Sequence, residues 1–347
     1  MRHACRAAGA LGLVALGADA LSAQCEVDAK RYVIPDAPAF TYLGAAPTSI
    51  ARPSAARDLA LAVAEGIDST GRARRGLAID VVPWLLFPKR VTNARYRTRL
   101  GDFVYANTQL SLGTARSTGD SASTDLAIGL KTNLANGADP LRDAALGERI
   151  DAAVAECRRS SRGPDGRPDG ALLEACADRA VGDSVARWLD EDGHWNDVAL
   201  AVAGAFGARL SESRIDQLRG RGGAVWATLA LPVGARFGQL LVQGRGDVVR
   251  GGGRGARDTT AFSGGARLGI GATSVNGFVE LVGSWRNLGD ERATQQWSSG
   301  VELRVAEALW LSTGFGSRYD ALTRGNRAVL LANVRWNTTS APQLVAR

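Results

Sequence analysis

The chain has 347 residues, a formal net charge of +7, 45% hydrophobic residues and 22% charged residues. This balance is near the globular average and excludes a disordered chain, and no apolar run reaches the roughly 18 residues of a membrane-spanning helix. Because the chain has only two histidines and no Cys-x-x-Cys pair, we expect no metal and no cofactor.

Residues 1–23 have the pattern of a secretory signal peptide. Two arginines open the segment, small apolar residues follow to residue 18, and Leu21-Ser22-Ala23 resembles a cleavage site. A retained helical anchor is one alternative. A lipoprotein attachment at Cys25 is another, which Gln24 disfavours because a small residue is wanted at that position.

Residues 24–56 form a proline-rich lead without a sustained hydrophobic period. We expect this lead either to extend through the periplasm or to tuck into a lumen. Export permits disulfides, and three cysteines remain after the signal is removed. Cys157 and Cys176 lie in one helical insertion, where a disulfide could close a helix pair. Cys25 would then be a free thiol or an intermolecular partner.

Residues 57–337 alternate apolar and polar side chains in short segments separated by turn residues. In Val301-Glu302-Leu303-Arg304-Val305, the apolar side chains lie on one side of a strand and the charged ones on the other. We place twelve strands, an even number as in single-chain bacterial barrels. The predicted strands are 57–67, 76–86, 102–114, 122–134, 196–208, 223–232, 236–249, 259–272, 276–287, 295–305, 308–318 and 327–337.

Alternation alone fits a soluble β-sandwich as well as a membrane barrel, and the connection lengths separate the two. If the last strand ends in the periplasm, the turns on that side include 232–235, 273–275 and 306–307, whereas the outer loops include 210–222, 250–258, 287–294 and 319–325. Short turns on one side and longer loops on the other favour a membrane barrel. The long connection 87–101 is an exception. Trp226, Trp285 and Trp297 fall near outer strand ends, where an interfacial aromatic girdle would lie.

Residues 138–194 interrupt the strands with two segments of helical periodicity, joined by a loop rich in glycine and proline. We predict a helical hairpin on the periplasmic side. The insertion is acidic, with thirteen Asp or Glu against eight arginines. Its apolar stripes either pack only on each other or dock on the barrel mouth, plug it, or meet a periplasmic protein.

In these strands and turns the chain resembles bacterial outer-membrane β-barrel proteins as a general class, over about four-fifths of its length. The resemblance implies an all-β fold, an antiparallel transmembrane β-barrel of about twelve strands in the outer membrane of a Gram-negative-type envelope. It also implies contact with outer-membrane lipid or lipopolysaccharide, and with the barrel assembly machinery. Trp336 stands where such barrels carry a terminal aromatic residue, although a tail, 338–347, follows it.

Charged side chains recur on the polar face of the predicted strands, where they would line a lumen. They either pair across it as a structural network or line a narrow water-filled path whose opposed charges select small solutes. We therefore predict a narrow, porin-like pore for small polar solutes, or a filled structural or partner-binding barrel. The predicted lumen-lining residues are Asp80, Asp125, Lys131, Arg245, Asp247, Arg267, Glu280, Arg286, Glu302, Arg304 and Arg335.

Catalysis is not expected, and neither is a nucleic-acid partner, since no recognition fold is visible. His194 is the only histidine left after the signal to serve as a base, and no serine stands in a nucleophile setting. Asp80 and Asp125 could act as an acid and base pair, but carboxylates among arginines are more often ion-paired. Arginines of the predicted outer loops either contact lipopolysaccharide phosphates or are ordinary solvated charges: Arg74, Arg75, Arg219, Arg221 and Arg254.

Overall fold

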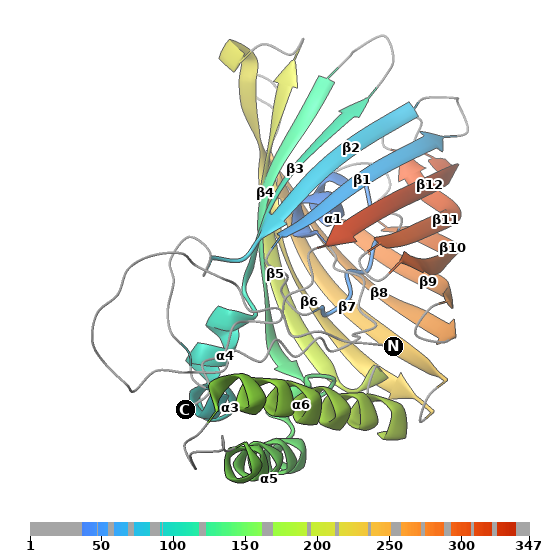
Figure 1. Ribbon diagram of the computed structural model, residues 1–347. Helices are drawn as coiled ribbons and strands as arrows, with labels where there is room; N and C mark the ends of the chain where they lie inside the picture. Colours follow the sequence, from blue (N-terminus) through green and yellow to red (C-terminus); the bar gives the residue numbers. More distant parts are fainter. Residues whose placement is uncertain are drawn as a thin grey trace.

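Twelve antiparallel strands close into a barrel, in which each strand pairs with its sequence neighbours and β1 pairs with β12 (Figure 1). The predicted barrel of twelve strands is thereby confirmed. The computed structural model describes residues 37–46, 48–54, 59–68, 73–83, 91, 93–117, 123–161, 169–192, 196–211, 215–234, 237–250, 258–271, 275–287, 293–306, 309–320 and 325–337.

The strands run from one end of the barrel to the other in alternating direction. Their bounds are β1 Leu59–Asp68, β2 Ala73–Val81, β3 Gln109–Ser117, β4 Ser123–Asn136, β5 Ala199–Ser211, β6 Leu218–Val233, β7 Gly238–Val249, β8 Thr259–Gly271, β9 Val275–Arg286, β10 Ala293–Ala306, β11 Leu309–Asp320 and β12 Gly325–Asn337. Most of these strands lie within a few residues of the predicted ones.

The third predicted strand, 102–114, is wrong over its first half, because α4 (Leu100–Ala106) occupies that stretch. Asp102, Phe103 and Tyr105 alternate as a strand would, but Phe103 is buried against Tyr96 of α3 (Asn93–Thr98) at a ring distance of 5.3 Å. Asp102 accepts hydrogen bonds from Arg95 in the same helix pair. Tertiary packing therefore overrides the local strand pattern in this connection.

All long helices lie at one end of the barrel, which we call the helical end (Figure 1). The connection from β2 to β3 carries α3 and α4, and the connection from β4 to β5 carries η1 (Pro140–Arg142), α5 (Ala144–Ser160) and α6 (Gly170–Asp192). The opposite end is called the loop end. Among the described residues, none of the helices combines the length and the apolar character needed to cross a bilayer.

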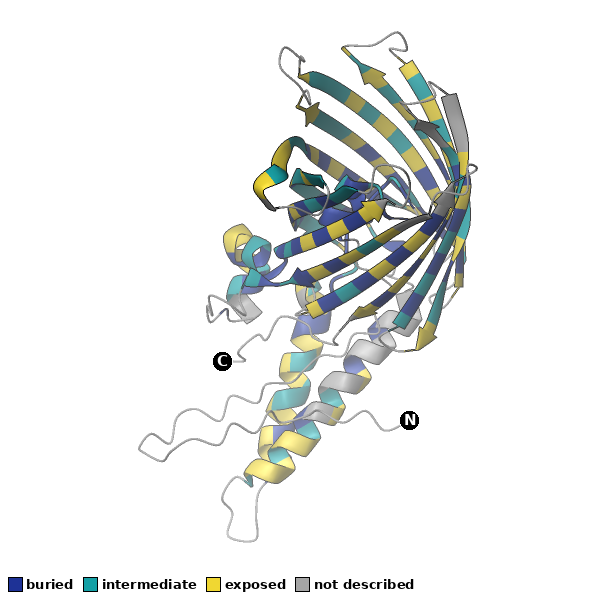
Figure 2. Ribbon diagram, turned by 90° about the horizontal axis from the view of Figure 1, so that it is seen from above, coloured by how far each residue is buried: buried dark blue, intermediate teal, exposed yellow. Residues whose placement is uncertain are grey.

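Buried and exposed residues alternate along the strands, as the stripes of Figure 2 show. The exposed outer residues are largely apolar, and many of the buried inner residues are polar. Phe206 is 73% exposed on the outer face, and Val225, Leu281 and Leu330 are exposed on neighbouring or opposite parts of the wall. Most of the predicted lumen-lining residues, in contrast, are buried. An exterior of this kind suits hydrocarbon, whereas a soluble monomer rarely exposes so large an apolar surface.

Trp226 departs from its predicted place at a membrane interface. Strand β6 begins at Leu218, five residues before its predicted start, so that Trp226 lies well inside the strand. The side chain points inward, is 4% exposed, and lies 5.4 Å from the guanidinium carbon of Arg245. Trp285 and Trp297 are exposed on the outer face, as an interfacial position requires.

The lumen contains part of the proline-rich lead. Residues 37–46 and 48–54, called the closing segment below, include the short helix α1 (Pro38–Leu43), which Figure 1 shows enclosed by the strands. These residues of the lead therefore lie in the lumen, which is one of the two placements expected from the sequence. Pro38 packs at Gly129, near the middle of β4, and Ser54 contacts Asn133, nearer the helical end of that strand.

Candidate functional site

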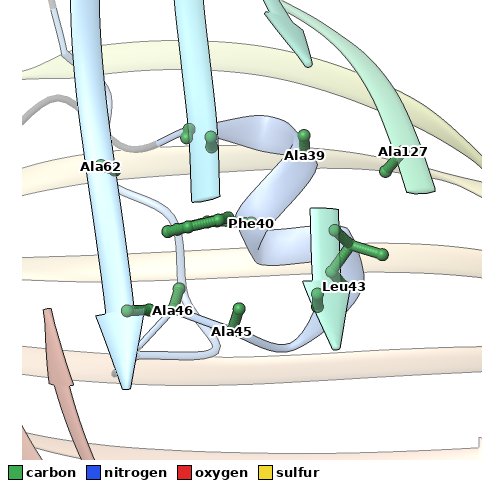
Figure 3. Packing of buried hydrophobic residues seen from close by; sticks show 11 residues of the cluster. Ala39, Phe40, Leu43, Ala45, Ala46, Ala62 and Ala127 are labelled. Carbon is green, nitrogen blue, oxygen red and sulfur yellow. The ribbon is translucent and has the colours of Figure 1, made fainter. Parts of the chain in front are cut away.

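The wall beside α1 is built from glycine and alanine, which leaves room for a helix in the lumen. A Cβ atom at Gly113 would lie 2.8 Å from the Cβ of Ala39, and one at Gly129 would lie 2.9 Å from the Cβ of Pro38. Distances this short are not tolerated between carbon atoms. Figure 3 shows Phe40 and its neighbours in α1 amid wall alanines such as Ala62 and Ala127.

The next turn of the closing segment is held through its backbone. The Glu280 carboxylate accepts hydrogen bonds from the backbone N–H groups of Ser49 at 2.8 Å and Ile50 at 3.0 Å. The Gln243 side chain accepts from the backbone N–H of Ala51 at 2.9 Å and donates to the Ser49 carbonyl at 3.3 Å. Among the described residues, no cation forms an ion pair with Glu280, so these N–H groups stabilise its buried charge.

Arg52 extends this arrangement with a charge of its own. Its guanidinium forms a salt bridge of 3.1 Å with Glu302, and both side chains are at most 5% exposed. Glu302 also pairs with Arg267 at 2.5 Å. The guanidinium of Arg267 lies 4.2 Å from the ring centroid of Phe278. The Glu302 carboxylate is shared between two arginines. If either arginine is removed, the carboxylate keeps an ion pair with the other.

The segment leaves the lumen past polar residues of β4. Lys131 donates a hydrogen bond to the Ser54 hydroxyl, and the Asn133 side chain donates to the Ser54 carbonyl at 3.0 Å. Lys131 is buried, and one of its partners, Ser54, belongs to the closing segment.

Two charged clusters lie nearer the loop end. Asp125 pairs with Arg209 at 2.8 Å and with Arg221 at 2.7 Å. Arg245 pairs with Asp247 at 2.6 Å and donates to the Thr41 carbonyl of α1 at 3.4 Å. The first cluster joins β4, β5 and β6, whereas Arg245 and Asp247 both belong to β7, and Arg245 contacts α1 from that strand.

Of the remaining predicted lumen residues, Asp80 interacts electrostatically with Lys131 and Arg335. Asp80 and Arg335 are buried, and Arg286 is half-buried. The half-buried Arg304 lies near Trp310, with 5.9 Å between its guanidinium carbon and the ring centroid. Asp80 lies level with Ser111 and Gly129, four residues along β4 from Asp125, which is roughly 13 Å at the usual rise of a strand. The two carboxylates are therefore too far apart to act on one bond.

The arginines predicted in outer loops are strand residues wherever the structure describes them. Arg74 and Arg75 belong to β2, and Arg219 and Arg221 belong to β6. Arg221 points into the lumen because a register shift opposite Gly207 and Ala208 reverses the strand faces. Gly222 permits that shift with a φ of 116°. The exposed Arg75 pairs with Glu65 at 3.1 Å, while Arg254 and His194 lie outside the described residues.

The helical insertion is a packed hairpin. A disulfide joins Cys157 of α5 to Cys176 of α6, and Figure 1 shows the two helices side by side at the helical end. Asp143 caps α5 by accepting from the backbone N–H of Leu146 at 2.8 Å, and it accepts from the Trp188 indole at 2.7 Å. No group of three or more His, Cys, Asp or Glu within the described part of the chain could hold a metal ion.

Sequence reasoning offered the lumen as one placement of the lead, but it did not identify the contacts between the closing segment and the wall. Ser49, Ile50 and Ala51 contact the wall through backbone N–H groups, which leave no trace in residue type. A usable signal was the line of small residues on the inner face of β2 to β4, including Gly113 and Gly129, because wall positions that face an open lumen do not need to be small.

No family model matches the sequence, and no curated protein matches it. Three solved structures illustrate its likeness. An outer membrane channel from Pseudomonas putida F1 is 9% identical with a TM-score of 0.43, over 83% of this chain and 97% of that chain. KdgM porin is 6% identical with a TM-score of 0.40, over 80% and 99%. LpxR from Salmonella typhimurium is 9% identical with a TM-score of 0.39, over 80% and 100%.

These values are too low to carry a statement about activity. The fold rests on the structure itself, a closed barrel of twelve strands with apolar residues outside and polar residues within. That architecture is the fold of outer-membrane β-barrel proteins, because only a closed barrel lets strands satisfy every backbone hydrogen bond in hydrocarbon.

Proposed function

We propose that the chain is an outer-membrane channel for small polar solutes and that the closing segment holds it shut in this structure. The helical end faces the periplasm in this proposal, because the shortest turns between strands lie at that end. The solute path runs where the closing segment now lies, between the glycine-rich face of β2 to β4 and the charged face of β7 to β10.

The observation that carries the proposal is how the segment is held. Its contacts with Gln243, Glu280 and Glu302 are hydrogen bonds or ion pairs that water can replace. In this proposal the segment withdraws toward the helical end, the end of β4 near which Ser54 contacts Asn133. The polar side chains that it leaves would then line a wetted path.

A filled structural barrel is the second candidate, and the fit of α1 favours it. Gly113 and Gly129 leave no space between the wall and the helix, as a permanent core would require. In that case the closing segment would be part of the folded barrel and would not move. Conductance measurements separate the two functions.

The experiment compares two arginine substitutions in planar lipid bilayers. Arg52→Ala removes the buried salt bridge to Glu302, and Arg75→Ala removes an exposed salt bridge on the outer face, where both partners are at least 60% exposed. We expect rare openings of reproducible size from the unaltered chain, a several-fold higher open fraction for Arg52→Ala, and no change for Arg75→Ala. Silence of all three proteins, each folded, would reject the channel and retain the filled barrel.

A further inference from the structure

The wall of β7 to β10 binds the closing segment through the backbone atoms of that segment. Three consecutive backbone N–H groups, those of Ser49, Ile50 and Ala51, are each bound by a side chain of the wall, and the Ser49 carbonyl is bound as well. Glu280 and Gln243 supply these contacts from β9 and β7. Hydrogen bonds to backbone atoms do not depend on which side chains the bound strand carries.

Side-chain contacts add a preference at two positions. Ile50 is 1% exposed and packs on Ala199, Ala230 and Leu241, and a Cβ at Gly265 would lie 3.1 Å from its Cδ1 atom. Two residues further on, Glu302 binds the guanidinium of Arg52, and Arg267 fixes the other oxygen of that carboxylate. The wall thus offers a small apolar pocket and a buried anionic partner at a fixed spacing.

We propose that this wall is a binding site for an extended peptide with an apolar residue and, two positions later, an arginine, and that residues 49–52 occupy it as an internal ligand. The inference rests on the proposed function only for the route by which an external peptide reaches the lumen. The proposal identifies the small polar solute of the channel as a peptide. A sugar or a simple ion presents neither three aligned N–H groups nor a guanidinium.

The internal ligand sets the conditions under which an external peptide binds. A tethered segment competes at an effective concentration in the millimolar range, so the unaltered chain masks the site. Arg52→Ala removes the charged anchor from the internal ligand and leaves every wall residue in place. The protein for the test is therefore the full chain with Arg52→Ala, purified in detergent, with heat-modifiable migration on a gel as the check that the barrel is folded.

The probe is a fluorescent peptide with the sequence of Thr48–Ser54, and the comparison peptide carries alanine in place of its arginine. We expect saturable binding to the Arg52→Ala protein, at least about tenfold tighter for the arginine peptide, since hydrogen bonds to charged groups are the strong ones. Adding Glu302→Gln should reduce the ratio between the two peptides to less than about threefold. Adding Glu280→Gln should weaken both peptides equally.

Equal affinity of the two peptides for the Arg52→Ala protein would overturn the proposal, as would the lack of saturable binding to a folded barrel. A ratio that survives Glu302→Gln would also overturn it, because the arginine would then bind elsewhere. Channel openings without peptide binding would reject the peptide site and keep the channel. Peptide binding by a protein that stays silent in bilayers would keep the site and reject the channel.

Discussion

Gly113 shows how a single residue decides what the lumen can hold. Its inner face touches Ala39 of α1, and an added Cβ would lie 2.8 Å from that methyl group. The methyl group sits directly on the backbone of a buried helix, so it cannot rotate away as a long side chain could. Space for the closing segment therefore depends on the absence of a side chain at this wall position.

We expect Gly113→Val to push α1 away from the wall. Overpacking of this kind typically costs about 1–3 kcal/mol, which here weakens the hold on the closing segment rather than the strand pairing. Liposomes that contain the variant should swell several-fold faster in a small neutral sugar than liposomes with the unaltered chain. Gly244→Val is the matched control, because a Cβ at Gly244 meets nothing within 4 Å. Equal swelling rates for both variants would contradict the packing argument.

The sequence shows that glycine occupies an inner position of the wall, but it does not show which group the glycine makes room for. Gly113 and Gly129 belong to predicted strands, where glycine signals a close approach of some other group without saying which. Charged positions were easier to place, since alternation alone puts Glu280, Glu302 and Arg267 on the inner face. Their partners depend on register and on the closing segment, which no local pattern encodes.

The helical insertion is an element whose stability can be separated from that of the barrel. Its disulfide joins residues 19 apart in sequence, and a crosslink over a loop of about this length contributes about 3 kcal/mol in the chain-entropy description. We expect Cys157→Ser to raise amide hydrogen exchange in α5 and α6 by roughly a hundredfold, since about 1.4 kcal/mol corresponds to tenfold. Exchange in the strands should stay unchanged, and equal loss of protection in both regions would show that they unfold together.

Asp143 gives a second test of the same element. It caps α5 and also accepts the Trp188 indole hydrogen bond, so Asp143→Ala should cost about 1–2 kcal/mol for the cap alone and more with the lost tether. Thermal unfolding of the insertion, followed by Trp188 fluorescence, should shift to lower temperature. Asp151→Ala, at an exposed position of the same helix, should leave the transition in place. A shift of equal size in both variants would point to charge rather than to capping.

Elements were predictable from sequence to different degrees for physical reasons. The strands follow from alternation, and the insertion follows from helical spacing, because each pattern reflects one buried face. Helices α3 and α4 were missed because each spans fewer than eight residues, too few to establish a period. Strand β6 was predicted too short, because the glycines and arginines near its start are typical of a turn. In the structure these residues belong to the strand, and Gly222 lies at a bulge in it.

At the scale of the whole molecule, the apolar exterior requires hydrocarbon around it. Phe206 lies near the middle of β5 and is 73% exposed, so Phe206→Arg should cost about 2–4 kcal/mol of stability in lipid. Leu218→Arg is the matched control at the loop end of β6, where the cost should be about 0–1 kcal/mol. Urea unfolding in vesicles measures both. Equal and small costs would indicate water rather than lipid around the barrel.

The position of the closing segment can be tested by crosslinking it to the wall. An added Cβ at Gly76 would lie 3.2 Å from the Cβ of Ala45, close to the 3.5–4.5 Å of a disulfide. Cysteines at both positions, in a chain with Cys25→Ser, should join under oxidation and lock the channel silent in bilayers. Reductant should restore openings, with the Cys25→Ser chain under the same treatment as the control. Failure to crosslink, or openings that persist while the bond is intact, would contradict a lumen closed by the closing segment.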